Sequence, residues 1–269
     1  GVMSFCRAGI LSEPPMVSAA SWAIAMDGEI LFSKGAGEVR QIASLTKVMT
    51  AIVVLENVAK DPKQLEQIVR VSHRASIIFG TSALLEEGDR LTVEDLLYAL
   101  LLPSGNDAAI VLSEFYGRRM HGKTGQDAMT RFLAVMNRKA DSLGLAQTTF
   151  VDVHGMGENL STARDLLELA DVAMENPIFQ KVVAAESYSS PVRTKRATTR
   201  EMRWKNTNNL LGEFNGIKTG HTNTAGGCLL LSGEFNGALL RVVVLDSSNK
   251  RTRFRDAYNL LQWALYRTT

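Results

Sequence analysis

Ser44 and Lys47 lie three residues apart at the start of a segment, residues 43–59, that is otherwise almost entirely apolar. Residues three apart share one face of a helix, so the hydroxyl and the amine can meet there. A serine hydroxyl becomes a good nucleophile when a base lies beside it, and a lysine is a base only when its surroundings lower its pKa. The pair predicts nucleophilic catalysis, but an N-cap serine followed by a lysine that extends to solvent has the same spacing.

A second motif, Ser104-Gly105-Asn106, follows Pro103, which ends one predicted helix just before another begins. In so tight a turn, the side chains of Ser104 and Asn106 can point the same way. A hydroxyl can relay a proton, and a carboxamide can hold a peptide carbonyl. Ordinary turns also favour these residue types, so the motif alone indicates little.

A third motif, Lys218-Thr219-Gly220, lies in a predicted strand after Gly216. A lysine and a hydroxyl at a strand edge can grip a carboxylate. Gly220 lets another chain approach the backbone closely, so an extended peptide can add as a further strand. An exposed strand end with a polar face has the same pattern.

The elements that must position these motifs change along the chain. Residues 18–34 predict a β-hairpin around an Asp27-Gly28 turn. Residues 61–171 are mostly helical in pattern, with capping pairs at Thr92 and Asp95 and at Thr162 and Asp165. Short apolar segments after residue 206 predict antiparallel strands, and the last segment predicts an amphipathic helix.

Strands therefore open and close the chain, and helices fill its middle. The predicted fold class is α/β (α+β): an antiparallel β-sheet flanked by helices, with an inserted mainly helical subdomain. We expect one domain over residues 18–269, with sheet parts at 18–60 and 206–269, a helical subdomain at 61–171 and an N-terminal extension at 1–17. A ligand site is expected in the cleft between the parts.

The bulk composition excludes several classes of partner. The chain has 269 residues with 30 basic and 28 acidic side chains, a formal charge of +2, so neither nucleic acid nor an anionic membrane is expected as the main partner. The apolar segments are too short to cross a bilayer, and residues 1–20 lack a signal-peptide pattern. Membrane association is thus not predicted from this chain, and its oligomeric state is left open.

Cofactors are not expected either. The four histidines form no ligand pair of metal-binding spacing, which argues against a zinc peptidase; they are His73, His121, His154 and His221. Two cysteines, Cys6 and Cys228, are too few for a disulfide framework, and we expect them to be unpaired.

The three motifs together, in this order, resemble the signature of penicillin-binding proteins and serine β-lactamases. Longer segments resemble the low-molecular-mass D-alanyl-D-alanine carboxypeptidases over residues 18–263, nearly the whole chain. These segments are "LEEGDRLTVEDLLYALLLPSGNDAA", "VDVHGMGENLSTARDLLELA", "NTNNLL" and "GIKTGHTNTAGG".

The resemblance implies a serine D,D-peptidase domain over residues 18–269 with the β-lactamase and penicillin-binding-protein transpeptidase-like fold. It would hydrolyse the terminal D-alanine of peptidoglycan stem peptides through an acyl-enzyme, and β-lactams would acylate it. Ser44 would be the nucleophile and Lys47 its base. Ser104 would pass the proton to the leaving D-alanine, and Asn106 would hold the substrate amide and fix Lys47.

The resemblance also implies a substrate-binding strand. The backbone N–H groups of Ser44 and His221 would form the oxyanion hole. Lys218 and Thr219, followed by Gly220, would bind near the substrate carboxylate. Their positive potential would help to keep the catalytic lysine neutral. Arg253, just before the last helix, lies where the family has an arginine for that carboxylate.

Family members act in the periplasm or cell envelope, so an extracytoplasmic location is implied. Many also carry a small β-rich domain and a membrane anchor; because the printed sequence stops at Thr269, neither is expected here. Six basic residues predict a solvated hairpin or, alternatively, a surface that attracts an anionic wall polymer. They are Arg193, Lys195, Arg196, Arg200, Arg203 and Lys205.

Two alternatives stay open. A class A-like β-lactamase would need a glutamate that activates the deacylating water, and Glu158, after His154, is the candidate. A non-catalytic penicillin-sensing or wall-binding module on the same scaffold is the other, although every motif residue is intact.

Overall fold

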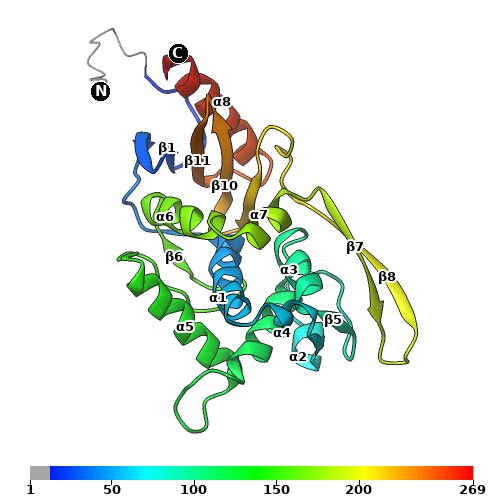
Figure 1. Ribbon diagram of the computed structural model, residues 1–269. Helices are drawn as coiled ribbons and strands as arrows, with labels where there is room; N and C mark the ends of the chain where they lie inside the picture. Colours follow the sequence, from blue (N-terminus) through cyan, green and yellow to red (C-terminus); the bar gives the residue numbers. More distant parts are fainter. Residues whose placement is uncertain (1–12, 269) are drawn as a thin grey trace.

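A five-stranded antiparallel sheet is the centre of the molecule. The computed structural model describes residues 13–268 and is shown in Figure 1. The strand order is β2-β1-β11-β10-β9, so strands from both ends of the chain pair directly. Their bounds are Ser21–Met26 (β1), Glu29–Lys34 (β2), Gly216–Thr222 (β9), Gly226–Phe235 (β10) and Ala238–Ser247 (β11).

The predicted hairpin at the start of the chain is confirmed. β1 and β2 pair antiparallel, and the turn residues Asp27 and Gly28 have φ angles of 46° and 83°. A two-residue turn with both φ angles positive matches the twist of the flanking strands, which is why Asp-Gly is favoured there.

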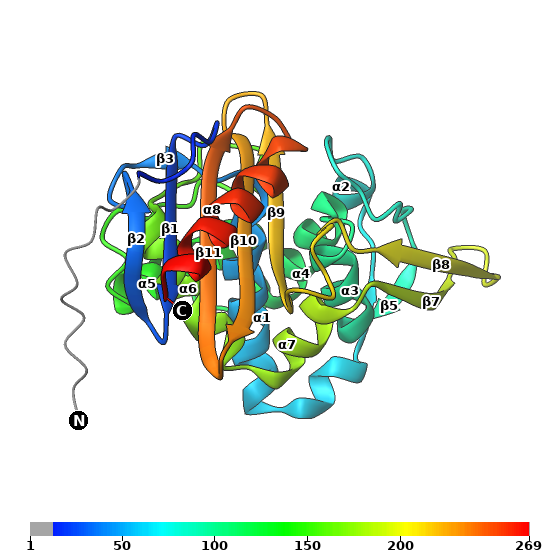
Figure 2. The ribbon, with the colours of Figure 1, turned by 90° about the horizontal axis from the view of Figure 1, so that it is seen from above.

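Helices cover both faces of this sheet, as Figure 2 shows. Alternate strand residues point to opposite faces. Trp22 and Val244 pack with helix α8 (Thr252–Thr268), whereas Ala23 and Val243 face the core that holds α1 (Thr46–Lys60) and α6 (Ala163–Met174). Helix α1, which begins two residues after Ser44, is thus part of the larger core.

Helices fill the middle of the chain, as the sequence predicts. Thr92 and Asp95 form a reciprocal capping box at the start of α3, and Thr162 accepts a hydrogen bond from Asp165 N at the start of α6. The helices are α2 (His73–Ser76), α3 (Val93–Leu101), α4 (Asn106–Gly117), α5 (Ala128–Ser142) and α7 (Pro177–Ala184), with 3-10 turns η1 (Ala43–Leu45) and η2 (Pro62–Glu66).

The structure adds a second sheet, of which the sequence analysis indicated only the hairpin at the basic residues 193–205. It is four-stranded, in the order β4-β5-β7-β8, and its hairpin β7–β8 projects from the helical part (Figures 1 and 2). Two of its strands have three residues each, too few for a period of two to stand out. The strands are β4 (Ile68–Arg70), β5 (Arg90–Thr92), β7 (Ser187–Arg193) and β8 (Thr199–Lys205); β3 (Arg40–Gln41) and β6 (Leu160–Ser161) form a separate pair.

The cysteine prediction is tested only in part. Cys228 is a buried free thiol on β10, and Cys6 lies outside the described residues. No helix within residues 13–268 has both the length and the apolar character that crossing a membrane requires.

Candidate active site

Ser44 and Lys47 face each other at the start of α1, the first α-helix of the described residues. The 3-10 turn η1 leads directly into α1, and Lys47 Nζ lies 2.9 Å from Ser44 Oγ. Every residue of α1 from Thr46 to Leu55 is buried, so the lysine cannot reach solvent from this position. The arrangement excludes the alternative of an N-cap serine with a solvated lysine.

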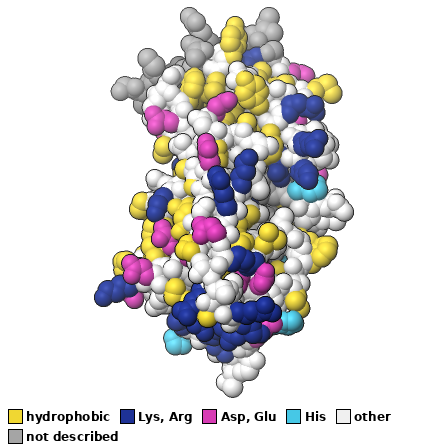
Figure 3. Space-filling model, turned by 90° about the vertical axis from the view of Figure 1, so that its right-hand side faces the viewer, with side chains coloured by type: hydrophobic (Ala, Val, Ile, Leu, Met, Phe, Trp, Pro, Cys, Tyr) yellow, Lys and Arg dark blue, Asp and Glu magenta, His cyan; other side chains and the backbone are white. Residues whose placement is uncertain are grey.

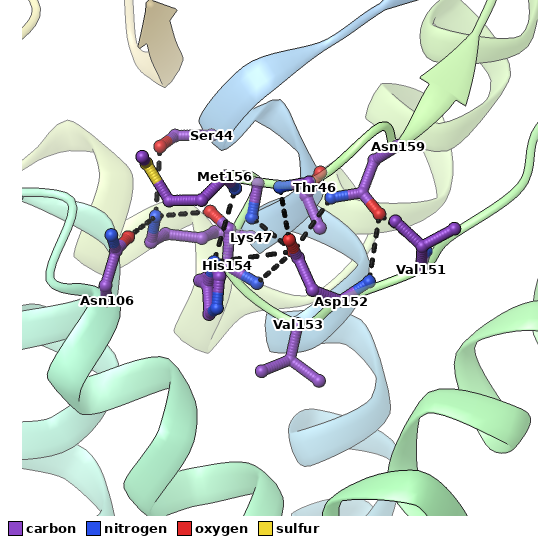
Figure 4. Close-up of polar contacts among 12 residues, drawn as sticks. Ser44, Thr46, Lys47, Asn106, Val151, Asp152, Val153, His154, Met156 and Asn159 are labelled. Carbon is purple, nitrogen blue, oxygen red and sulfur yellow. Dashed lines mark hydrogen bonds and ion pairs between the residues drawn. The ribbon is translucent and has the colours of Figure 1, made fainter. Parts of the chain in front are cut away.

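Two carbonyl oxygens hold the lysine amine. Lys47 Nζ donates to Asn106 Oδ1 at 2.7 Å and to His154 O at 2.6 Å (Figure 4). The Asn106 amide is oriented by its own Nδ2, which donates to Phe79 O at 2.8 Å. A neutral amine has two N–H bonds and one lone pair. With both N–H bonds used on these oxygens, the lone pair is left to face Ser44 Oγ.

Burial lowers the pKa of Lys47 from 10.5 to about 7, against the opposing effect of the Asp152 and Asp107 carboxylates. Desolvation disfavours the charged ammonium, so a substantial fraction of the amine is neutral near pH 7. The sequence analysis expected both burial and neighbouring cations to lower the pKa of Lys47. In the structure, burial is the largest cause, and the Asp152 and Asp107 carboxylates act against it.

The loop after α5 supplies the second acceptor, which the sequence analysis missed. The Asp152 carboxylate accepts hydrogen bonds from the backbone N–H groups of His154 and Gly155 at 2.9 and 2.6 Å, and from Asn159 Nδ2 at 2.8 Å (Figure 4). These bonds turn the loop so that His154 O points at the lysine. A backbone carbonyl carries no side-chain signal, and only the "VDVHGMGEN" segment marks it in the sequence.

Gly155 allows this loop to lie against the backbone of Ala43 and Ser44. Its φ is +101°, and a Cβ placed on it would overlap the carbonyl oxygen of Ala43 and lie 2.8 Å from Ser44 N. Only glycine combines this backbone angle with so close an approach. The loop and the start of α1 are therefore in direct backbone contact.

Ser104 has the features of a strained functional residue. Its φ is +65°, and its buried Oγ has no hydrogen-bond partner among the described residues. A non-glycine residue in this conformation costs about 1–3 kcal/mol and persists where the surroundings impose it. Here Thr81 Oγ1 donates to Ser104 O at 2.6 Å and fixes the turn.

Strand β9 lies directly beside Ser44. A Cβ on Gly220 would be 2.9 Å from Ser44 N, so the close approach that this glycine permits is to the chain's own backbone. Lys218 is 1% exposed, and its Nζ donates to Thr219 O at 2.9 Å. The hydroxyls of Thr219 and Thr207 are 2.6 Å apart.

Two further basic side chains, Lys218 on β9 and Arg253 beside it, lie at this strand. Burial, followed by repulsion from Lys47 and Arg253, lowers the pKa of Lys218 well below its usual value. Arg253 is 7% exposed, and its Nη1 donates to Gly220 O at 2.7 Å. Burial lowers the pKa of Arg253 to about 10. The guanidinium thus holds the β9 backbone, and its predicted contact with a substrate carboxylate stays a prediction.

The backbone of His221 continues β9 opposite Gly227 of β10, and its side chain is exposed. The structure thus brings Lys47 to both Ser44 and Asn106 and places the β9 backbone at Gly220 beside Ser44 N.

A family model described as D-alanyl-D-alanine carboxypeptidase matches residues 9–249. The chain belongs to this family. Its sequence is 33% identical to a D-alanyl-D-alanine carboxypeptidase of Streptomyces sp. strain K15, over 98% of this chain and 92% of that protein. It is 32% identical to a D-alanyl-D-alanine endopeptidase of Pseudomonas aeruginosa, over 88% of this chain and 73% of that protein.

The fold of this carboxypeptidase-family chain matches solved structures as well. The crystal structure of the Streptomyces K15 DD-transpeptidase superposes with a TM-score of 0.87 and 34% identity, covering 95% of this chain and 100% of that one. The predictions of the family, of a serine-type peptidase and of the fold are confirmed.

Two further observations concern the alternative of a β-lactamase and the possibility of a metal site. Glu158, the candidate deacylating residue of a β-lactamase, is exposed on the loop after His154. No group of three or more His, Cys, Asp or Glu side chains within residues 13–268 is arranged to hold a metal ion.

Proposed function

We propose that this chain removes the terminal D-alanine from peptidoglycan stem peptides by way of an ester on Ser44. The observation that carries the proposal is the amine of Lys47, held by two carbonyl oxygens with its lone pair toward Ser44 Oγ. Lys47 takes the hydroxyl proton while Oγ forms a bond to the carbonyl carbon between the two D-alanines.

The oxyanion that forms accepts hydrogen bonds from the backbone N–H groups of Ser44 and His221. The contact of Gly220 with Ser44 N supports this role, because it brings β9 and the nucleophile into one site. Ser104 Oγ then passes the proton to the leaving nitrogen, the C–N bond breaks and D-alanine departs. Water hydrolyses the ester, and the free serine returns.

Substrate recognition uses the polar groups of β9 and the guanidinium beside it. Arg253 gives this strand a positive potential that suits the terminal carboxylate of the peptide, and the Lys218 amine and Thr219 hydroxyl add hydrogen-bond donors near it. Asn106 acts mainly by positioning Lys47, because both atoms of its amide already have partners within the protein. We infer an extracytoplasmic location from the location of this substrate.

A penicillin enters the same sequence of steps. Ser44 Oγ attacks the β-lactam carbonyl, the ring C–N bond opens, and the amine stays attached to the acyl group. The ester then persists, because no leaving group diffuses away. Slow turnover after near-stoichiometric acylation separates this function from a β-lactamase, which would turn over many times per second.

The proposal is tested by intact-mass measurement after penicillin treatment, followed by D-alanine release from a synthetic acyl-D-Ala-D-Ala peptide. We expect one covalent adduct per chain and measurable D-alanine. The Ser44→Ala variant controls for non-specific attachment and should show neither. A protein that folds but forms no adduct would favour the non-catalytic module instead.

A further inference from the structure

Three arginines form a row across the second sheet. Arg70 of β4 lies directly opposite Arg90 of β5, and Arg90 lies directly opposite Arg193 of β7. All three are exposed, whereas the residues next to them, Val69 and Leu91, are buried. The three side chains therefore share the outer face of the sheet. Like charges in directly opposite positions destabilise a sheet, so this row is unfavourable without a bound anion.

Nearby carboxylates do not neutralise the row. Glu87 pairs with Lys195 at 3.3 Å and with His73 at 3.1 Å, whereas Glu86 and Asp89 each pair with Arg200 at 2.6 Å. Glu201 lies on the same outer face, diagonal to Arg193, without an ion pair to it. Within residues 13–268, none of the three arginines of the row has an acidic partner within 4.0 Å.

The row lines a cavity of about 150 Å³. A Cβ on Gly88 would lie 2.8 Å from Lys195 Cβ, so the lysine stem packs directly against Gly88, and both residues line this cavity. Figure 3 shows Lys and Arg side chains gathered at the end of the molecule where the β7–β8 hairpin projects. The remaining lining residues are Thr194 and Ala197.

We propose that this cavity binds the phosphate groups of a poly(glycerol phosphate)-type envelope polymer. The planar guanidinium group fits phosphate with two parallel hydrogen bonds, and adjacent strands about 5 Å apart place neighbouring guanidinium groups on one phosphate. Nucleic acid suits the cavity less well, since no aromatic side chain lines it to stack on a base. The choice of an envelope polymer rests on the proposed function; the phosphate chemistry rests on the arginine row alone.

The test measures binding of poly(glycerol phosphate) to the full chain over a series of salt concentrations. We compare two variants that remove the same charge. One is the row variant R70Q/R90Q/R193Q, and the other is a control with three exposed cations on other elements, K34Q/R138Q/R164Q.

We expect the row variant to bind at least tenfold more weakly and its salt slope to fall by about 2, with less than a twofold loss in the control. D-alanine release should be the same in both variants, so failure here is distinct from failure of the peptidase assignment. The melting temperature of the row variant should equal or exceed that of the wild type, because repulsion is removed.

Equal losses in both variants would show general attraction to charge and overturn the proposal. Equally tight binding of polyglutamate would overturn phosphate recognition, and tighter binding of single-stranded DNA would overturn the envelope polymer as the occupant. If the row variant is unstable, R70K/R90K/R193K provides the second measurement: it keeps the charge and removes the paired hydrogen bonds, so unchanged affinity would overturn the proposal.

Discussion

At the scale of single residues, the chemistry depends on whether the Lys47 amine is neutral or protonated. Its amine is enclosed, and its two N–H bonds have fixed acceptors. Protonation adds a third N–H, which would point at Ser44 Oγ and occupy the hydroxyl that must be activated. In the proposed mechanism, the same geometry that makes the neutral amine a base makes the ammonium form inactive.

The rate of acylation should therefore depend on pH through this lysine. With the pKa of Lys47 near 7, the neutral fraction falls about tenfold for each pH unit below 6. We expect the rate of acylation by a fluorescent penicillin to rise with pH and to level off above about 8. A rate that keeps rising to pH 10 would mean that burial does not lower the lysine pKa.

Asn106→Asp tests how a negative charge beside Lys47 changes the pKa of that lysine. It places a carboxylate beside Lys47 Nζ, and an opposite charge this near raises a lysine pKa by about 1–3 units. We expect the rising limb of the pH profile to move up by at least one unit, with at least a tenfold loss of acylation at pH 7 and recovery at higher pH.

Asn106→Ala is the matched control for this variant. It also removes the Nδ2 hydrogen bond to Phe79 O but adds no charge. A profile that moves equally in both variants would indicate loss of positioning rather than an electrostatic effect.

At the scale of elements, the site depends on close backbone contacts at the start of α1. Gly155→Ala adds a Cβ that overlaps Ala43 O at a φ of +101°. We expect at least a tenfold slower acylation, because the loop or Ser44 must shift, and a clear loss of thermal stability.

Gly212→Ala is the control, since Gly212 has a φ of +100° with nothing within 4 Å of the added Cβ. The strain alone should cost about 1–2 kcal/mol and leave acylation unchanged. Equal effects of the two variants on acylation would show that the contact with Ala43 is unimportant.

Local signals explain which elements could be predicted. Asp27-Gly28 specifies a turn through two positive φ angles, and the pair Thr92 and Asp95 specifies a helix start through reciprocal hydrogen bonds. Each signal lies within four residues. β4 and β5 lack such a signal, because their pairing joins segments that are far apart in the sequence.

The site could be predicted to a similar extent. The lysine, its serine and Asn106 stood out by residue type and motif order. The roles of Asp152 and His154 did not stand out. Asp152 acts by shaping a loop, and His154 acts through its backbone carbonyl oxygen. The part that Arg253 plays in holding Gly220 O was likewise hidden, since it depends on tertiary contact.

At the scale of the whole molecule, one buried carboxylate joins the start of the described residues to the last helix. Asp256 on α8 accepts hydrogen bonds from Ser18 Oγ at 2.6 Å and Ala19 N at 3.0 Å. The same helix packs Trp263 against Trp22 and Phe32 of the first hairpin. Helix α8 thus holds the first described hairpin, β1–β2, and the residues just before it in place.

Asp256→Ala should therefore destabilise the whole domain. Buried donors that lose their acceptor cost about 1–3 kcal/mol, which denaturant unfolding can measure. We expect a single unfolding transition and unchanged acylation by penicillin in native buffer. Asp141→Ala, at an exposed position on α5, should change stability by less than 0.5 kcal/mol, a value about the size of ordinary surface effects.

The enclosure of α1 has a consequence for drug resistance. Since its residues from Thr46 to Leu55 are buried, substitutions along it would damage the enzyme together with its affinity for antibiotics. Mutants that escape β-lactams while still processing their peptide should arise instead at exposed apolar residues near Asn106. Phe79 and Met156 are such positions, because Phe79 O accepts a hydrogen bond from Asn106 and Met156 packs near Gly80. Selection should thus act at the exposed margin of the active site while the helix stays unchanged.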